Sequence, residues 1–316
     1  MAPPEAAKIT RRTVFLSIST ATVLIAVKVW AWVASGSVSI LSSLADSSLD
    51  LAASLMTLWA VIYAAEPPDE EHRFGHGKAE GFAALMQAAL VGASAALIAR
   101  EAIERFFAPR SIENGGLSIG VMVFSIIMTA TLIWFQSRAV AKTGSVATKG
   151  DMAHYTADLA ANVAVIAGVI GAAFLNMPLA DPIIGLGVAA WLAWGAFGVA
   201  RDAVDQLMDR ELDDEARARI TALAEADDII VHSLRTRASG PIIHIQFHLE
   251  MPNTLSLIEA HEQMVACERR ILDEFPGADI LIHPDPRGAK PHGGGFFKEK
   301  SAEESGRGEA LDQVSK

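Results

Sequence analysis

Two pairs of ionisable side chains lie within segments that are otherwise apolar enough to cross a bilayer. Asp46 and Asp50 form one pair, and His154 and Asp158 form the other. Each pair is spaced i, i+4, so on a helix its two members share one face, one turn apart. Because charge at membrane depth is costly, such groups usually face a bundle interior, a water-filled cavity or a bound ion. Three carboxylates and one imidazole can surround a divalent metal tetrahedrally, which predicts a metal-ion transporter.

A purely structural role is the first alternative for these four residues. One Asp in a transmembrane helix can serve only as a hydrogen-bond acceptor between neighbouring helices. The same i, i+4 spacing occurs in two separate segments, however, and a structural role does not require that repetition. The repeated pattern therefore favours a metal site.

The composition indicates a membrane protein that also has a water-soluble part. Of the 316 residues, 51% are hydrophobic, and the mean hydropathy is +0.31. The net charge of −11 is uneven: 14 basic and 23 acidic residues follow from Arg201 onward, against 12 and 14 before it. The acidic character belongs to the soluble part, so nucleic acid is not an expected partner. The only cysteine, Cys267, excludes an internal disulfide and a thiolate cluster.

Six apolar stretches occupy the first two thirds of the chain, each near the ~20 residues that a membrane span needs. They are Thr13 to Ala34, Ser39 to Ala65, Ala79 to Phe107, Leu117 to Phe135, Met152 to Leu175 and Asp181 to Ala200. Basic residues concentrate before the first stretch, between the second and third, and between the fourth and fifth. By the positive-inside rule, both termini and the soluble part are cytoplasmic.

The pattern after Ala200 predicts a small domain with the element order αββαβ. The expected elements are a helix at Asp213 to Ala226, strands at Ile229 to Thr236 and Pro241 to Glu250, a helix at Leu255 to Phe275, and a strand at Asp279 to His283. This order suggests helices packed on one mixed sheet. From Gly288 the chain is polar and Gly-rich, and we expect disorder to its end.

A second group of possible ligands lies between the second and third apolar stretches. Asp69, His72 and His76 occur there beside Gly75 and Gly77, where the backbone can bend ligands around an ion. Exposed loops also hold His and Asp for solubility alone. Taken without other context, both explanations stay open.

The soluble part holds a third group. Its histidines are His232, His244, His248, His261 and His283. Any one of them could be a core residue, but five within about 50 residues favour metal binding. Side chains alternate along a strand, so His244 and His248 share one face. Asp285 follows His283 at a strand end, and mixed nitrogen and oxygen ligation suits zinc, with a carboxylate able to bridge two ions.

Six short motifs carry a family resemblance. They are SLADSSLD at Ser43 to Asp50, RFGHGKAE at Arg73 to Glu80, HYTAD at His154 to Asp158, HSLRTRASGP at His232 to Pro241, FHLEM at Phe247 to Met251 and IHPDP at Ile282 to Pro286. Together they resemble the cation diffusion facilitators, most closely the bacterial branch that exports zinc or ferrous iron. The resemblance covers about Arg12 to Pro286.

The resemblance implies a homodimer in a bacterial inner membrane. Each protomer would have an all-α six-helix transmembrane domain and a cytoplasmic α+β domain similar to metallochaperones. We therefore expect a cytoplasmic tail at 1–12, the transport domain at 13–208, a metal-binding and dimerisation domain at 209–287 and a disordered tail at 288–316.

The resemblance also implies roles for individual residues. The transport site would comprise Asp46, Asp50, His154 and Asp158, and a loop site would comprise Asp69, His72 and His76. A cytoplasmic binuclear site would comprise His232, His248, His261, His283 and Asp285, with Asp285 bridging. Lys78 and Asp209 match a charge pair that joins the two protomers. His244 has no counterpart and could be an extra ligand or a surface residue.

The ligand types indicate a mechanism. A metal ion needs His154 neutral and the carboxylates ionised, so metal and protons compete for the same groups. If the site faces metal on the cytoplasmic side and protons on the other, the inward proton gradient drives metal out. One imidazole favours zinc or cadmium over calcium or magnesium, but separates zinc less well from iron, cobalt or manganese.

Two other classes of protein could place His and Asp in this way. An intramembrane metalloenzyme is disfavoured because the sequence has no His-Glu-x-x-His and no nucleophile motif, and three carboxylates make a bound metal a poor Lewis acid. We therefore expect no enzymatic activity. A membrane-anchored metal sensor could use the cytoplasmic residues alone, but it would not need the four ionisable groups in the spans. It remains the second hypothesis.

Overall fold

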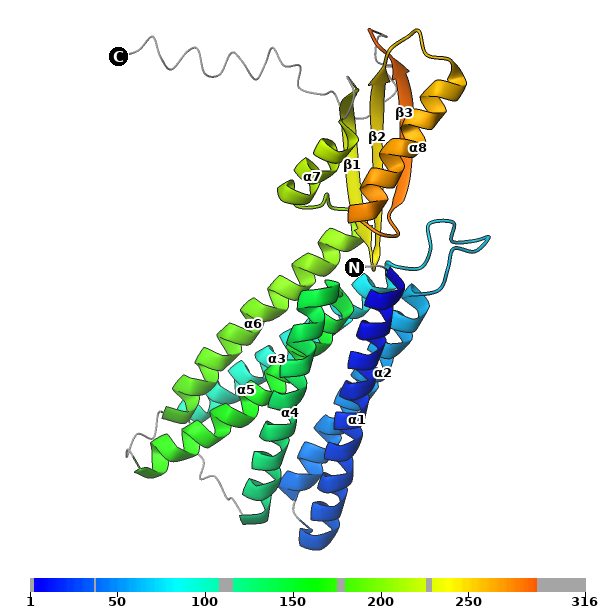
Figure 1. Cartoon of the computed structure of the whole chain (residues 1–316). Helices are drawn as coiled ribbons and strands as arrows, with labels where there is room; N and C mark the ends of the chain where they lie inside the picture. The colour runs from blue at the N-terminus through cyan, green and yellow to red at the C-terminus, as the bar shows by residue number, and fades with distance from the viewer. Residues whose placement is uncertain (1–2, 37, 108–115, 175–179, 226–228, 289–316) are drawn as a thin grey trace, which may run out of the picture. The chain divides into compact units, whose positions relative to one another are not determined.

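The computed structural model describes residues 3–36, 38–107, 116–174, 180–225 and 229–288, which form two compact units. The first unit is built from six long helices (Figure 1). The second contains most of a three-stranded sheet and two shorter helices. The tail predicted to be disordered lies outside the described residues, apart from Gly288 itself.

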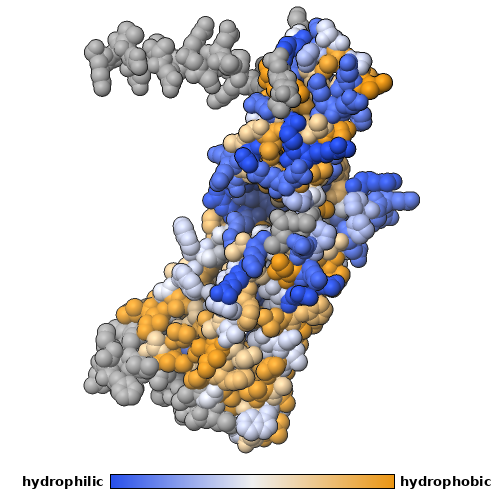
Figure 2. Space-filling view, viewed as in Figure 1, coloured by the Kyte–Doolittle hydropathy of each residue, from blue (hydrophilic) through white to orange (hydrophobic). Residues whose placement is uncertain are grey.

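The six long helices confirm the predicted six-helix domain. They are α1 (Pro3–Ser35), α2 (Val38–Ala64), α3 (Ala79–Phe107), α4 (Gly116–Thr143), α5 (Val146–Phe174) and α6 (Ala180–Leu207). Within the described residues, all of these except α5 are found long and apolar enough to cross a membrane. Large apolar side chains such as Trp30, Trp191 and Trp194 are exposed on the helices. Many hydrophobic residues gather on the face of the helical unit seen in Figure 2. Such a surface suits contact with lipid rather than water.

Several helices extend beyond the apolar stretches that predicted them. The helix α1 begins at Pro3 rather than near Thr13, and α4 continues to Thr143. The expected N-terminal tail is therefore helical from Pro3 onward. Hydropathy detects only the apolar part of a helix, whereas long basic side chains such as Lys8 and Arg11 favour helix equally well and can reach water.

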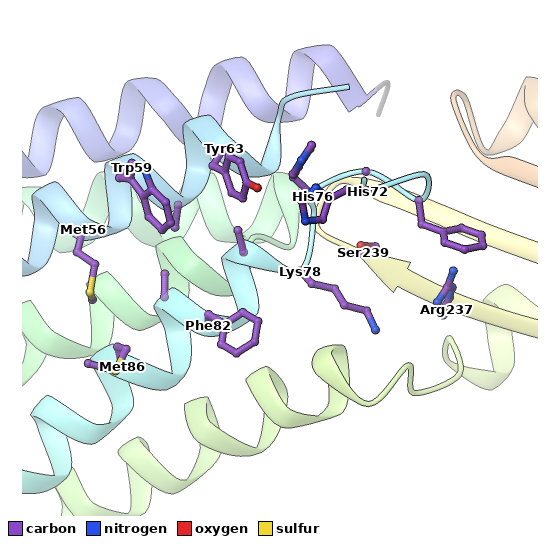
Figure 3. Close-up of a pocket in the computed structure, with 15 residues that line it drawn as sticks. Met56, Trp59, Tyr63, His72, His76, Lys78, Phe82, Met86, Arg237 and Ser239 are labelled. Carbon is purple, nitrogen blue, oxygen red and sulfur yellow. The ribbon is translucent and has the colours of Figure 1, made fainter. Parts of the chain in front are cut away.

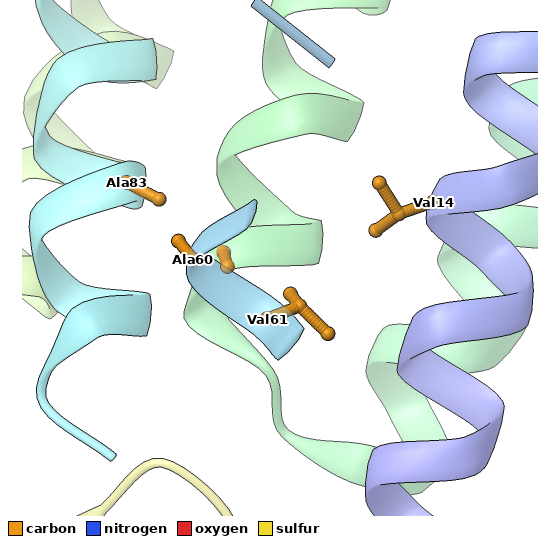
Figure 4. Close-up of a cluster of buried hydrophobic side chains, with 5 residues drawn as sticks. Val14, Ala60, Val61 and Ala83 are labelled. Carbon is orange, nitrogen blue, oxygen red and sulfur yellow. The ribbon is translucent and has the colours of Figure 1, made fainter. Parts of the chain in front are cut away.

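Small side chains allow the helices to approach one another closely. A buried cluster of Val14, Ala60, Val61, Ala83 and Ala147 joins α1, α2, α3 and α5 (Figure 4). Without a hydrophobic force between helices in lipid, close van der Waals packing of this kind holds a bundle together. The bundle therefore depends on small side chains, which allow neighbouring helices to pack closely.

Gly150 provides a test of this packing. It lies where α5 meets α3, and a Cβ atom there would be 3.0 Å from both Ala84 Cα and Gln87 Cβ. We expect Gly150→Leu to destabilise the helical unit by about 1–3 kcal/mol, the usual cost of overpacking. Thermal melting of the detergent-purified protein measures this. Gly195→Leu is the control, because no atom of the described residues lies within 4 Å of a Cβ at Gly195. Equal melting temperatures for the two variants would contradict the close α3–α5 packing.

The sheet and the two shorter helices follow the predicted αββαβ order. The elements are α7 (Asp214–Ala224), β1 (Ile230–Ser239), β2 (Ile242–Met251), α8 (Leu257–Glu274) and β3 (Asp279–Pro286). The strand order is β1-β2-β3. The strands β1 and β2 are joined by the tight turn Gly240-Pro241, where Gly240 has a φ of 56° that suits glycine. The strands β2 and β3 are parallel, so the sheet is mixed as predicted.

The two faces of β2 differ sharply. Ile245, Phe247 and Leu249 are buried on one face. The helices α7 and α8 contribute buried Ile220 and Ile271 to the core of this unit. Because side chains alternate along a strand, the opposite face of β2 carries His248. The core thus fixes which face of the sheet can hold the polar cluster.

Candidate metal sites

Three of the four residues predicted for the membrane site meet between α2 and α5. His154 Nε2 lies 3.0 Å from Asp50 Oδ1 and 3.9 Å from Asp158 Oδ2. One ligand atom from each of these residues lies within 4.8 Å of the other two. Asp50 and His154 are buried. Residues 104 positions apart are therefore brought together around one nitrogen, in a geometry that a divalent ion could occupy.

The fourth predicted residue stands apart. Asp46 is exposed on α2, one turn before Asp50, and it does not belong to the group whose ligand atoms lie within 4.8 Å. The i, i+4 spacing places Asp46 on the correct face, as expected. The periodicity of α2 alone could not show which part of that face α5 contacts.

A buried carboxylate beside this site was missed from the sequence. Asp151 lies on α5, three residues before His154, and is fully buried. Its Oδ1 accepts a hydrogen bond from Ser54 Oγ (3.0 Å) on α2, and its Oδ2 accepts one from Gln136 Nε2 (2.8 Å) on α4. Gln87 Nε2 on α3 is 3.5 Å from Oδ1. The predicted span began at Met152, one residue too late to include this group.

The same network reaches α1. Gln136 Nε2 lies 3.1 Å from Ser17 Oγ, and Tyr155 OH lies 3.0 Å from Ser54 Oγ. Tyr155 OH also donates to the carbonyl of Ser17 at 3.3 Å. Buried polar groups stabilise a unique arrangement when their partners are satisfied. This network ties α5, the helix that carries His154, to four other helices.

A second missed residue is Lys28 on α1. It is the only charged residue of the first apolar stretch, yet its side chain is buried. A charge inside a predicted span is the sequence signal that could have found it, by the same reasoning that selected Asp50.

The predicted loop group is also brought together. Asp69 Oδ1 lies 3.4 Å from His72 Nδ1, and Asp69 Oδ2 lies 3.2 Å from His76 Nε2. The backbone N–H of His72, together with that of Glu71, donates to the Asp69 carboxylate and lowers its pKa. His76 is buried and its ring packs on Tyr63, with centroids 4.4 Å apart. This arrangement favours an ionised carboxylate between two imidazoles, which is a suitable set of zinc ligands.

The loop group borders a cavity of about 440 Å³. Figure 3 shows His72 and His76 at one end of this cavity, with Trp59 of α2 and Phe82 and Met86 of α3 along its length. The lining is mostly apolar. The imidazole nitrogens therefore lie at the loop end of the cavity.

The predicted charge pair also forms, and it forms within one chain. Lys78 Nζ lies 3.0 Å from Asp209 Oδ1 and donates to the carbonyl of Leu207 at 3.2 Å. Asp209 follows the end of α6 with a φ of 58°, a left-handed conformation that Asp tolerates better than most residues. The pair therefore links the start of α3 to the end of α6. A role between protomers stays a prediction.

The sheet gathers most of the predicted cytoplasmic ligands around one carboxylate. Asp285 Oδ2 lies 3.1 Å from His232 Nε2 and 2.8 Å from His248 Nδ1, and Asp285 Oδ1 lies 3.3 Å from His283 Nε2. The three residues His232, His248 and Asp285 offer ligand atoms within 4.8 Å of one another. Each of the three strands therefore contributes, because β2 lies between β1 and β3. Both oxygens of one carboxylate face imidazoles, as a bridging ligand requires.

The charge environment of Asp285 fits this role. Partial burial on its own would raise the pKa of the carboxyl, but the hydrogen bond with His248 and the nearby rings of His283 and His232 outweigh it and lower the pKa. An ionised carboxylate is the form that binds metal. Ser233, next to His232, has a φ of 54°. This unusual backbone conformation accompanies the one ligand that β1 supplies.

Two histidines lie outside this cluster. His261 is exposed on α8 and is not part of the group with His232 and Asp285. His244 is buried, and its Nδ1 lies 2.8 Å from Oδ2 of Asp279, its register partner on β3. His244 therefore pairs two strands rather than lying free on the surface. The sequence did not show that His261 lies outside the cluster or that His244 pairs with Asp279, because the fold decides which residues of α8 and of the strands lie near each other.

The comparisons with known proteins decide the family. A family model described as the cation efflux transmembrane domain matches residues 14–208, and one described as the cation efflux protein cytoplasmic domain matches residues 212–287. The chain belongs to the cation efflux family, also called the cation diffusion facilitators. It is thus a membrane-embedded transporter rather than an enzyme, as its sequence predicted.

Several relatives are similar over nearly their whole length. The cation-efflux pump FieF of Yersinia enterocolitica is 39% identical over 290 residues, which cover 91% of this chain and 96% of that protein. The cation-efflux pumps FieF of Salmonella typhimurium and Klebsiella pneumoniae are each 38% identical and cover 92% of this chain, at 97% and 98% of their own lengths. The resemblance found in the short motifs therefore extends across both units.

The cytoplasmic cluster generates a stability prediction. Metal that binds only the folded state stabilises it by mass action, by about 2.7 kcal/mol at 100 times the Kd. For a fragment of residues 209–287 this raises the melting temperature by roughly 10–20 °C. Asp285→Ala should remove most of that increase, because three imidazoles share this carboxylate. Asp279→Ala, which alters only the His244 pair, is the control. A fragment that melts identically with zinc and with chelator would show that these histidines bind no metal.

Proposed function

We propose that this protein is a proton-coupled antiporter that exports divalent transition metals, with zinc as the main substrate, from the cytoplasm. The observation that carries the proposal is the convergence of Asp50, His154 and Asp158 between two apolar helices. Names of the relatives, which describe cation-efflux pumps, support the direction of transport. Iron, cadmium, cobalt and manganese are the other candidate substrates.

The choice of zinc rests on the ligand set. One imidazole and two carboxylates meet directly, and this mixture suits zinc better than calcium or magnesium, which prefer all-oxygen sites. We assign Asp46 as the fourth ligand, because it lies on the same face of α2 one turn before Asp50. Asp46 would reach the ion only if α2 or its own side chain moved.

Proton coupling follows from competition at His154. The imidazole must be neutral to bind metal, and its Nε2 already lies between two carboxylates that would stabilise a proton when metal is absent. Metal and proton therefore exclude one another at the same atom. An inward proton gradient then favours the protonated state on the outer side and drives metal outward.

The proposal also includes the orientation in the membrane, the oligomeric state and the roles of the other clusters. We place both termini and the domain at 209–287 in the cytoplasm, on the far side of the bilayer from the short loops that carry few basic residues. A homodimer is supported by the name of the cytoplasmic family model, ZT_dimer. We assign Lys78 and Asp209 to the joining of protomers, and the loop and cytoplasmic clusters to further zinc ions. His261 would join the cytoplasmic site only after a movement of α8.

The first functional prediction concerns Asp50. Asp50→Ala removes a buried carboxylate that contacts His154, so zinc flux into proteoliposomes should fall by more than about 100-fold. Even the loss of a partner outside the ligand set costs a metal site about 10- to 100-fold. Glu104→Ala is the control, because Glu104 forms only an exposed i, i+4 pair with Arg100. Undiminished flux in Asp50→Ala would refute the transport site. Zinc binding without flux in the wild type would instead favour a metal sensor.

The second functional prediction concerns His154. His154→Asp replaces the only nitrogen ligand by oxygen, so selectivity should move towards manganese and away from zinc. The pH dependence of flux should also move to lower pH, because an ordinary carboxyl titrates about two units below an ordinary imidazole. Flux measured across a panel of divalent ions and pH values tests both effects. If the variant keeps the wild-type metal ranking and the wild-type pH profile, His154 does not couple protons to metal.

A further inference from the structure

Lys28 is a buried cation beside the proposed transport site. It lies on α1 and is only 7% exposed. Its Nζ donates hydrogen bonds to Ser47 Oγ at 2.6 Å and to the carbonyl of Ser43 at 3.0 Å, both on α2. Ser47 lies between Asp46 and Asp50 in the sequence of the same helix. The ammonium group is therefore held against α2 at Ser47, within one helical turn of both Asp46 and Asp50.

Lys28 interacts electrostatically with the carboxylates that define the site. Asp46, Asp50 and Asp158 are the carboxylates near enough for their charges to act on Lys28. An ammonium group has no lone pair, so Lys28 cannot be a metal ligand. Its effect on a bound ion must act through charge. Asp151 also lies near the site, but its carboxylate accepts hydrogen bonds from Ser54 and Gln136 and is not one of the assigned ligands.

We propose that Lys28 is a specificity-determining residue that brings the combined charge of the four assigned ligands and its own ammonium group to −2. The ionised side chains of Asp46, Asp50 and Asp158 together contribute a charge of −3. Lys28 contributes +1, and a neutral His154 contributes no charge. One divalent cation then brings the loaded site to zero. This inference rests on the proposed transport function, and it adds that the site selects ions by charge as well as by ligand type.

The physical reason is the cost of unbalanced charge away from water. Charges in a low-dielectric interior are strongly unfavourable unless they are compensated. Without Lys28, a site loaded with a divalent ion would keep a charge of −1, and the ion would be attracted by one more unit of negative charge. It would bind more tightly and leave more slowly. Lys28 therefore limits affinity so that the ion can be released.

The test replaces Lys28 by Gln in the full chain and measures zinc flux in proteoliposomes. Lys28→Gln removes the charge but keeps a donor near Ser47. We expect the KM to fall by about tenfold or more, because one unit of charge at close range in a poorly screened site exceeds the 1.4 kcal/mol that corresponds to tenfold. We expect the maximal rate to fall as well, because release slows. A purely structural defect would raise the KM instead.

Two matched variants separate charge from shape. Lys28→Arg keeps the charge and should keep the KM within about threefold of the wild type, a limit well below the tenfold step expected for loss of charge. Lys8→Gln makes the same chemical change at an exposed position of the same helix and should change neither parameter. An unchanged or raised KM in Lys28→Gln, or the same fall in KM in Lys28→Arg, would overturn the proposal.

A binding titration and a second neutral variant cover the cases in which Lys28→Gln transports too slowly or does not fold. If Lys28→Gln is too slow for flux, equilibrium Cd²⁺ titration of the full-length protein replaces it, in a background of Asp69→Ala and Asp285→Ala that removes the carboxylate shared by the imidazoles in each of the other two clusters. Tighter Cd²⁺ binding supports the proposal, and unchanged or weaker binding overturns it. Lys28→Met serves as a second neutral variant. If neither neutral variant folds while Lys28→Arg does, the charge serves folding and the proposal fails. A wild-type protein that moves no metal refutes the proposed function itself, which is a separate result.

Discussion

The contact between Asp50 and His154 is the interaction on which the rest of the membrane unit depends. A carboxylate and an imidazole 3.0 Å apart can remain at membrane depth only if their charge is balanced by a proton, a metal ion or other fixed charges. The surrounding residues supply that balance and hold α2 against α5. The fold therefore tolerates buried charge at this position, where the proposed function requires a group that can exchange a proton for a metal ion.

The helix that carries His154 is positioned by further polar contacts on its N-terminal side. Asp151 accepts hydrogen bonds from neighbouring helices, and buried Glu80 of α3 accepts one from Ser145, which directly precedes α5, at 2.6 Å. Close packing at Gly150 brings α5 against α3. Polar contacts fix the register of α5, while small residues fix its distance from its neighbours. Both are needed to hold His154 opposite Asp50.

The three-stranded sheet also brings several ionisable side chains together. One carboxylate, Asp285, collects imidazoles from all three strands, and the apolar core on the other face fixes the order in which those strands lie. A small domain buries limited apolar surface, so a bound ion can add substantially to its stability. Under the proposed function, the two units use mixed nitrogen and oxygen groups for different purposes: exchange of an ion in the membrane unit, and cross-linking of strands in the sheet.

The sequence by itself determined the features that depend on local pattern. Hydropathy gave the six helices, period-two alternation gave the strands, and i, i+4 spacing placed His154 and Asp158 on one face, because each depends only on neighbouring residues. Which faces meet depends on packing between distant segments. Only the tertiary structure therefore showed that Asp46 and His261 stand outside their clusters. It also revealed the surroundings of Lys28 and Asp151, because partners from other helices decide whether a buried charge is balanced.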